Sequence, residues 1–226
     1  MKFEENEWSI TPQRAIAIQE ELKSEVILED RLGSIRLVAG TDVSYIRSEK
    51  VSRAAVAILS FPDLNLVDSA TSESTTEFPY IPGLLSFREI PAIMSVIAEL
   101  ERLPDLIICD GHGYAHPRRF GLASHLGILC DIPTIGVAKR LLTGTHKPVP
   151  NERGAWVPII VDGETIGAAL RSREYTKPIY VSIGHRVSLE TAIDLTMECT
   201  TRYRLPETTR MAHKLSKTPL SSDHHT

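Results

Sequence analysis

Three strand-like segments near the start of the chain, followed by a helix and another strand, constrain the fold more than any other feature. Short turns separate the segments Arg36–Ile46, Ala54–Ser60 and Leu64–Ala70, which favours an antiparallel meander. A long helix is expected over Leu84–Arg102, and a buried strand is expected at Leu106–Asp110. This order predicts an α/β protein with a mixed sheet and helices on its faces.

Local signals predict the remaining elements. Thr11 before Pro12 is typical of a helix start, since threonine caps helices and proline suits their first position. Asp162-Gly163 is a strong hairpin-turn signal between two strands within Trp156–Leu170. The polar segment Thr71–Thr76 is expected to be a loop. Further helices are expected over Phe120–Cys130, from Ser188 to Cys199 and over Glu207–Lys217, and further strands at Pro133–Ala138 and Pro178–Val187.

The length of 226 residues suits one α/β domain. We expect residues 1–217 to form it and residues 218–226 to be a polar tail. The three cysteines are too few and too scattered for a disulfide framework and lack zinc spacing, so we expect a cytoplasmic protein. No apolar run reaches the roughly 18 residues of a membrane helix, and the acidic start lacks the apolar region of a signal peptide. We therefore expect no membrane partner.

The net charge of −4 argues mildly against a protein that wraps nucleic acid, because phosphate contacts require Lys and Arg. It does not exclude a metal-dependent nuclease, in which cations offset a central group of acids. Local charge therefore matters more than the total.

Asp42 lies inside the apolar strand segment LVAGTDVSY. Aspartate is depleted in strands, and burying a carboxylate costs free energy unless it is paired or bound to a metal. The alternative is an exposed edge or bulge aspartate that follows Gly40.

Glu89 and Asp110 are also out of place in their apolar surroundings. At helical spacing Glu89 falls on an apolar stripe, although a glutamate near a helix start is also favoured by the helix dipole. Asp110 ends an apolar strand before a glycine turn, which is where α/β sheets place ligand-binding groups. The alternative for Asp110 is an ordinary turn or cap aspartate.

If the helix packs beside both strands, these three acids can converge. Such a cluster suffers like-charge repulsion and requires cations. Carboxylate oxygens, with water and phosphate, are preferred ligands of Mg²⁺ or Mn²⁺. The pattern indicates one or two metals, and a pair would lie about 3.5–4 Å apart for phosphoryl chemistry.

Four segments carry a resemblance to a known family: GTDVSY (40–45), FPYIPGLLSFRE (78–89), DGHGYAHPR (110–118) and GVAK (136–139). The most specific of them is the run that leads from Phe78 to Glu89. From about the first helix to Lys217, the chain resembles the endonuclease V family. The resemblance implies a ribonuclease H-like fold, with three antiparallel strands plus parallel strands and helices on both faces.

The family implies a deoxyinosine 3′-endonuclease that depends on Mg²⁺, with Mn²⁺ as a substitute. By resemblance, Asp42, Glu89 and Asp110 are the metal-binding and catalytic acids. His213 lies on the last helix, where this fold commonly supplies a fourth catalytic group; the alternative is an exposed helix histidine. A metal-activated water would hydrolyse the second phosphodiester bond 3′ to the altered base and leave 3′-hydroxyl and 5′-phosphate ends. The expected partner is DNA with deoxyinosine or other deaminated bases, bound by a monomer.

Tyr80 lies between two prolines, which stiffen its loop, so this side chain can enter a duplex as a wedge. The alternative is a tyrosine that merely packs. Glycine backbone groups can read the edge of an extruded hypoxanthine. Lys139 resembles the family's phosphate-contacting lysine, although a solvated lysine is common at a strand end. His116 serves either substrate or structure, and the basic stretch that begins at Arg118 is expected to contact phosphates. The expected substrate-binding residues are Pro79, Tyr80, Ile81, Pro82, Gly83, Leu85, Gly111, Gly113, His116 and Lys139.

Three alternatives remain open. The first is an inosine-specific endoribonuclease, which would depend on contacts to the 2′-hydroxyl. The second is a non-catalytic nucleic-acid-binding module of the same fold. In the third, the acids form ordinary ion pairs with Arg88 or Lys139.

Overall fold

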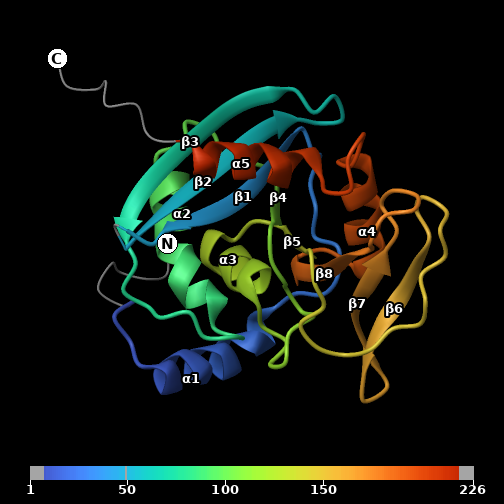
Figure 1. Cartoon of the computed structure of the whole chain (residues 1–226), viewed down its shortest axis with the longest axis horizontal. Helices are drawn as coiled ribbons and strands as arrows, with labels where there is room; N and C mark the ends of the chain where they lie inside the picture. The colour runs from blue at the N-terminus through green and yellow to red at the C-terminus, as the bar shows by residue number, and fades with distance from the viewer. Residues whose placement is uncertain (1–7, 49, 219–226) are drawn as a thin grey trace.

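The computed structural model describes residues 8–48 and 50–218 (Figure 1). Of the tail expected over residues 218–226, all but Thr218 lies outside these residues. One sheet of eight strands, in the order β3-β2-β1-β4-β5-β8-β7-β6, crosses the described part of the chain. The strands are β1 (Leu37–Ile46), β2 (Val51–Ser60), β3 (Leu66–Thr75), β4 (Leu106–Cys109), β5 (Thr134–Ala138), β6 (Trp156–Val161), β7 (Glu164–Leu170) and β8 (Ile179–His185). The helices are α1 (Pro12–Leu22), the short 3-10 turn η2 (Lys23–Glu25), α2 (Leu85–Ala98), α3 (Leu122–Cys130), α4 (Leu189–Glu198) and α5 (Glu207–Lys217).

The sheet is mixed, which confirms the predicted fold class. Strands β1, β2 and β3 form the antiparallel meander, and β1, β4 and β5 run parallel to one another. Beyond β5, strands β8, β7 and β6 pair antiparallel. The parallel strands place their carboxyl ends at one edge, where α/β sheets bind ligands.

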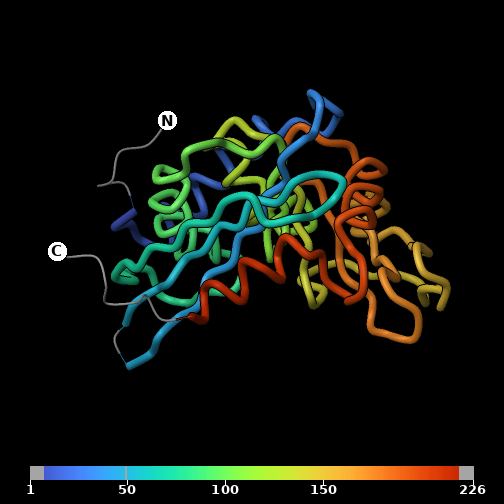
Figure 2. The backbone as a smooth tube through the Cα atoms, turned by 90° about the horizontal axis from the view of Figure 1, so that it is seen from above, coloured from blue at the N-terminus to red at the C-terminus, as the bar shows by residue number. Residues whose placement is uncertain are grey.

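Helices cover both faces of the sheet, as predicted. Helix α5 lies along one side of β1 and β2, and α2 lies on the other side (Figure 2). Apolar side chains of α4 and α5, such as Ile193 and Ala212, join one buried cluster with Val38 and Ile108 of the sheet. Side chains of α2 and α3 join a second cluster with the opposite sheet face. Two buried layers therefore hold the helices that carry candidate site residues.

Helix α1 lies away from the sheet and supports the segment that precedes α2. Its N-cap is confirmed, since the Thr11 hydroxyl accepts a hydrogen bond from the Arg14 amide at 3.2 Å. The buried face of α1 packs with Phe78, Leu84 and Phe87 in a third apolar cluster. Within the described residues, no helix has the length and apolarity that crossing a membrane requires.

Three predictions in the second half of the chain are confirmed. Asp162 and Gly163 have φ values of 51° and 84°, as a tight hairpin turn with two left-handed residues requires. Ser188 caps α4, because its hydroxyl accepts from the Thr191 amide at 3.2 Å. Helix α5 has the predicted bounds.

Two element predictions were wrong. Most of the segment expected as the loop Thr71–Thr76 belongs to β3, which pairs with β2 as far as Thr75. Serine and threonine suit an edge strand, because its outer side faces water and threonine is β-branched. The helix expected to reach Arg102 ends at Ala98, where the amide of Glu99 bonds to the carbonyl of Val96 instead of continuing the helical pattern.

Candidate active site

The two strand acids are neighbours because their strands are paired in register. Thr41 of β1 pairs with Cys109 of β4, and the next residue of each strand is Asp42 or Asp110. Glu89 comes from the first half of α2. All three acids line one cavity of about 270 Å³, here called the carboxylate cavity, so their predicted convergence is confirmed. The cavity is lined by Thr41, Asp42, Val43, Ser44, Glu89, Ile93, Asp110, Leu122, Lys139 and His213.

The carboxylate cavity carries an excess of negative charge. Burial, together with the negative charges of Asp42 and Asp110, raises the pKa of Glu89 to about 8. Burial also raises the pKa of Asp110, against the opposing effect of the Lys139 ammonium. The fold therefore holds these carboxylates together at an electrostatic cost.

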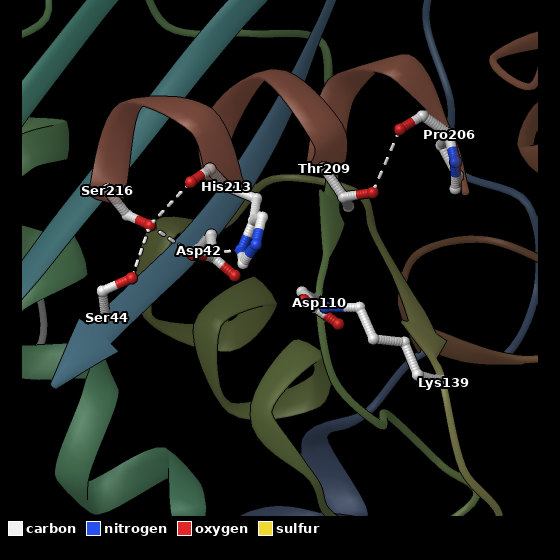
Figure 3. A network of polar contacts seen from close by, with 8 residues as sticks. All are labelled: Asp42, Ser44, Asp110, Lys139, Pro206, Thr209, His213 and Ser216. Atoms are coloured by element: carbon white, nitrogen blue, oxygen red, sulfur yellow. Dashed lines mark hydrogen bonds and ion pairs between the residues drawn. The ribbon is translucent and has the colours of Figure 1, made fainter. Parts of the chain in front are cut away.

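Lys139 follows β5 and donates a hydrogen bond to the carboxylate of Asp110, an ion pair at the wall of the cavity (Figure 3). The expected alternative of ordinary ion pairs therefore holds for this pair. Arg88 instead donates to the carbonyl of Phe78 at 3.1 Å and lies 4.2 Å from the centroid of the Tyr45 ring. No described ion pair involves Glu89.

Helix α5 holds Asp42 from above with two side chains (Figure 3). Nδ1 of His213 lies 3.2 Å from Oδ2 of Asp42, and the hydroxyl of Ser216 donates to the same oxygen at 2.5 Å. Ser44 Oγ lies 2.8 Å from Ser216 Oγ. His213 was expected at this site and Ser216 was not. The only sequence signal for Ser216 is its spacing of three residues after His213, which places both on one helix face.

Gly40 explains how α5 comes so close to β1. It lies two residues before Asp42 and therefore on the same face of the strand. A Cβ at Gly40 would lie 2.2 Å from the carbonyl carbon and oxygen of Thr208 on α5. Only glycine allows this approach, which brings His213 and Ser216 to Asp42.

The donor chemistry of the carboxylate cavity fits a divalent cation. Three carboxylates share the space, and the raised pKa of Glu89 reflects burial and then repulsion by its neighbours, both of which a bound cation would offset. In residues 8–48 and 50–218, however, no group of three His, Cys, Asp or Glu side chains is already placed so that it could hold a metal ion. In this arrangement Lys139 and Ser216 bond to Asp110 and Asp42.

A second cavity of about 290 Å³ adjoins the first, since Leu122 lines both. We call it the loop cavity, because the loop before α2 forms much of its wall. It brings together six of the predicted substrate-binding residues. They are Tyr80, Ile81, Pro82, Gly83, Leu85 and His116, and the other lining residues are Gln19, Ser86, His112, Gly121, Leu122, Arg140, Leu141 and Leu142.

Tyr80 projects from a loop whose ends are buried. Phe78 and Leu84 are 5% and 2% exposed, whereas Tyr80 between them is 69% exposed. Pro79 is exposed and does not line either cavity. The loop is therefore anchored at both ends and presents its aromatic ring to solvent.

Gly111 and Gly113 line neither cavity. The Gly113 amide donates to the hydroxyl of Ser182 at 2.9 Å, and the Gly111 amide donates to the carbonyl of Cys109 at 2.9 Å. Both amides are therefore already used within the protein, so their predicted contact with a base stays a prediction.

His112 of the same glycine turn lines the loop cavity and was not expected there. Its Nε2 lies 3.0 Å from the carbonyl of Arg140, which can only accept, so this nitrogen carries the hydrogen. Burial lowers the pKa of His112 to about 4, which leaves the ring neutral near pH 7. Its place between two glycines gives no sequence signal that separates a cavity residue from a turn residue.

Comparisons with known proteins agree on one relationship. The family model described as Endonuclease V matches residues 20–214. Over 215 residues the chain is 53% identical to the endonuclease V of a Nostoc species, which covers 95% of this chain and 97% of that protein.

Solved structures give the same result. The crystal structure of endonuclease V from Streptomyces avermitilis superposes with a TM-score of 0.88 at 44% identity, over 93% of each chain. Endonuclease V from Ciona intestinalis, in complex with a 24mer DNA containing an inosine followed by a ribo-adenosine, superposes with a TM-score of 0.82 at 31% identity. That match covers 91% of this chain and 95% of the Ciona chain.

Proposed function

The chain belongs to the endonuclease V family, and we propose that it cuts DNA beside deaminated bases, chiefly deoxyinosine. The proposed product ends are a 3′-hydroxyl and a 5′-phosphate, from hydrolysis of the second phosphodiester bond 3′ to the altered base. The complex of the Ciona relative with inosine-containing DNA supports this substrate class. We assign the activity to one domain that spans residues 1–217.

One observation carries the proposal: the carboxylate cavity and the loop cavity adjoin at Leu122. A base and the bond to be cut can therefore bind to neighbouring but separate sites. This arrangement supports cleavage at a bond displaced from the altered base, which leaves that base in place.

Asp42, Glu89 and Asp110 are the proposed ligands of a divalent cation, Mg²⁺ with Mn²⁺ as a substitute. Such a cation supplies Lewis acidity, which lowers the pKa of the attacking water and offsets the charge of the leaving oxygen. The protein's own contribution is to position the carboxylates that would hold the cation. Ser216 and His213 fix the carboxylate of Asp42 from α5, which is the task of residues that support a ligand.

Lys139 supplies a positive charge beside these acids. Its ammonium pairs with Asp110, and its side chain is 39% exposed, so it can also reach a phosphate that enters the cavity. We propose that Lys139 binds the phosphate next to the scissile bond. A single cation of this kind positions a backbone without reading sequence.

Tyr80 is the proposed wedge. It stands exposed on an anchored loop at the rim of the loop cavity, and an inserted aromatic ring can unstack a base step at a cost of a few kcal/mol. The extruded base would enter the loop cavity, whose volume of about 290 Å³ suits a planar heterocycle. Weak pairing of a deaminated base lowers the cost of extrusion.

The test is to incubate the protein with Mg²⁺ and an end-labelled duplex that contains one deoxyinosine, and to map the cut at single-nucleotide resolution. We expect a single nick at the second phosphodiester bond 3′ to the inosine. We expect no nick in the matched duplex without inosine. A cut at another position, or equal cutting of both duplexes, would contradict the proposal. Titration calorimetry with Mn²⁺ tests the metal separately, because an acid cluster held only by ion pairs would bind none.

An inosine-specific endoribonuclease is the second candidate. The nucleic acid bound by the Ciona relative carries a ribonucleotide directly after the inosine, which favours a test of RNA. Matched DNA and RNA strands with one inosine, cut side by side at equal concentration, separate the two candidates. Faster cutting of RNA would assign the 2′-hydroxyl a role in recognition.

A further inference from the structure

Three side chains from two distant parts of the chain donate hydrogen bonds to one backbone oxygen, the carbonyl of Gly83. Nε2 of Gln19 lies 3.1 Å from it, Nε2 of His116 3.0 Å and Nη2 of Arg118 2.7 Å. A carbonyl oxygen has two lone pairs, so three donors more than saturate it. Gly83 is the last residue of the loop that carries Tyr80, and it immediately precedes the buried Leu84.

The three donors are also bonded to one another. Nε of Arg118 donates to Oε1 of Gln19 at 2.6 Å, and the amide of Arg118 donates to Nδ1 of His116 at 3.2 Å. Gln19 donates in addition to the carbonyl of Phe120 at 3.0 Å. Gln19 and His116 are 1% and 3% exposed. We call Gln19, His116 and Arg118 the Gly83 clamp.

Both ring nitrogens of His116 form hydrogen bonds within the protein, which favours the structural one of the two roles expected for this residue. Nδ1 accepts from the Arg118 amide, so the hydrogen resides on Nε2 and points at Gly83. Its bonds therefore serve the structure of the loop. Arg118, which was expected to contact phosphates, likewise directs two of its nitrogens inward.

The clamp requires glycine at position 83. Its φ is +81°, in the left-handed region that glycine adopts freely, and an added Cβ would lie 3.0 Å from Nη2 of Arg118. At the other end of the loop, Arg88 donates to the carbonyl of Phe78 at 3.1 Å. The Tyr80 segment is thus held by hydrogen bonds at both ends.

We propose that the Gly83 clamp sets the position of the Tyr80 loop, and that Gln19 and Arg118 are positioning residues for recognition of the altered base. The proposal rests on the proposed function, since it assigns recognition to the same loop. It makes helix α1, which contacts neither strand acid, part of the specificity apparatus through Gln19. The clamp acts on binding of the damaged duplex and is separate from the carboxylates that are proposed to cut it.

The test compares Gln19→Ala and Arg118→Ala with Gln13→Ala, an exposed glutamine of the same helix. Cleavage of the single-inosine duplex is measured at increasing substrate concentration with Mg²⁺. We expect the two clamp variants to raise KM by about tenfold and to leave kcat within about twofold, the pattern of lost binding interactions. Gln13→Ala should match the wild type. A fall in kcat with unchanged KM, or equal behaviour of all three variants, would overturn the proposal.

Gln19→Glu is a sharper variant. A carboxylate can still accept from Arg118, but it cannot donate to the carbonyls of Gly83 and Phe120. We expect it to raise KM as Gln19→Ala does. Arg118→Lys retains one donor that can reach Gly83 and should restore part of the affinity. A Gln19→Glu protein with wild-type KM would show that donation to Gly83 does not matter.

Hydrogen exchange of the free protein distinguishes failure of the clamp from failure of the proposed function. In both clamp variants, the amides of residues 80–85 should exchange faster than in the wild type, while those of the sheet keep their rates. If the wild type does not cut inosine-containing nucleic acid, this measurement still decides whether the clamp holds the loop. Unchanged exchange in residues 80–85 would overturn the clamp.

Discussion

The carboxylate cavity and the loop cavity share Leu122 but differ in how their polar groups are satisfied. In the first, burial and then the charges of Asp42 and Asp110 raise the pKa of Glu89, which forms no described ion pair. In the second, the Gly83 carbonyl has three donors, and the ring nitrogens of His116 are both bonded. The contrast indicates that one cavity is suited to positive charge, whereas hydrogen bonds fix the position of the loop at the wall of the other.

The same contrast appears in the response to pH. The pKa of Glu89 is raised, so the metal-free folded protein holds a proton that the unfolded chain loses, and this group destabilises the fold as pH rises toward 8. The pKa values of His116 and His125 are lowered to about 4 and about 3, chiefly by burial. These groups act in the opposite direction, because the unfolded chain takes up their protons first as pH falls below about 6.5.

Asp110→Ala should produce the largest effect, because it removes one of the proposed metal ligands. We expect nicking of a single-inosine duplex to fall by more than about 100-fold, since even residues that only support a ligand contribute about 10–100-fold. Binding of the duplex without metal should change little, because the loop cavity is untouched. Single-turnover kinetics measures the rate of nicking, and a gel-shift experiment in EDTA measures the affinity for the duplex without metal.

Asp63→Ala, which removes an exposed aspartate from a turn, is the matched control and should cut normally. Circular dichroism should show that both variants fold. Normal cutting by Asp110→Ala would mean that the carboxylate cavity is not the cutting site, and the comparison between the two cavities would lose its functional meaning.

Ser216→Ala should have the next largest effect, because it removes the hydrogen bond to Oδ2 of Asp42 without changing any charge. We expect a fall in cutting of about 10–100-fold, the range for loss of a group that orients a metal ligand. Affinity for Mn²⁺, measured by calorimetry, should fall in parallel. Ser95→Ala is the control, since this exposed hydroxyl bonds only to the carbonyl of Pro91 within α2. A Ser216→Ala protein that binds Mn²⁺ and cuts as Ser95→Ala does would contradict a supporting role.

Ser216 also shows where prediction from the sequence ends. Asp42, Glu89 and Asp110 were identifiable because a carboxylate in an apolar pattern is locally anomalous. The contact of Ser216 with Asp42 joins residues 174 positions apart and depends on how closely α5 approaches Gly40. No local pattern encodes such a distance.

The fold shows the same division. Turns and caps are set by a few neighbouring residues, so the hairpin at Asp162-Gly163 and the cap at Ser188 were predicted correctly. The polar end of β3 was missed because its strand conformation comes from pairing with β2. The Gly83 clamp was missed for the same reason, since Gln19 finds its partners 64 to 101 residues away.

Tyr80→Ala tests the loop cavity separately from the carboxylate cavity. We expect affinity for the inosine duplex to fall by about tenfold, within the 1–3 kcal/mol that an aromatic ring contributes by stacking on one base. Mn²⁺ affinity should not change, because Tyr80 lies outside the carboxylate cavity. Tyr175→Ala is the control, since this tyrosine is 85% exposed and lines neither cavity. Equal affinity of both variants for damaged duplex would remove the wedge proposal.

His125→Phe should have the smallest effect and tests how the loop region is supported. His125 is 1% exposed and its ring packs at 5.0 Å from that of Phe87, beneath the loop. Because the folded-state pKa is about 3, the neutral ring stabilises the fold fully above about pH 6.5, and this contribution is lost as pH falls toward 3. Replacing it should reduce the pH dependence of the unfolding free energy by up to about 1.4 kcal/mol per pH unit below pH 6.5. Urea unfolding between pH 4.5 and 7 measures this slope.

Cutting at pH 7 by His125→Phe should stay near the wild-type rate, because the ring that replaces histidine is also neutral and aromatic. An unchanged slope would mean that His125 is protonated in the folded protein, and the loop region would then carry buried charge as the carboxylate cavity does.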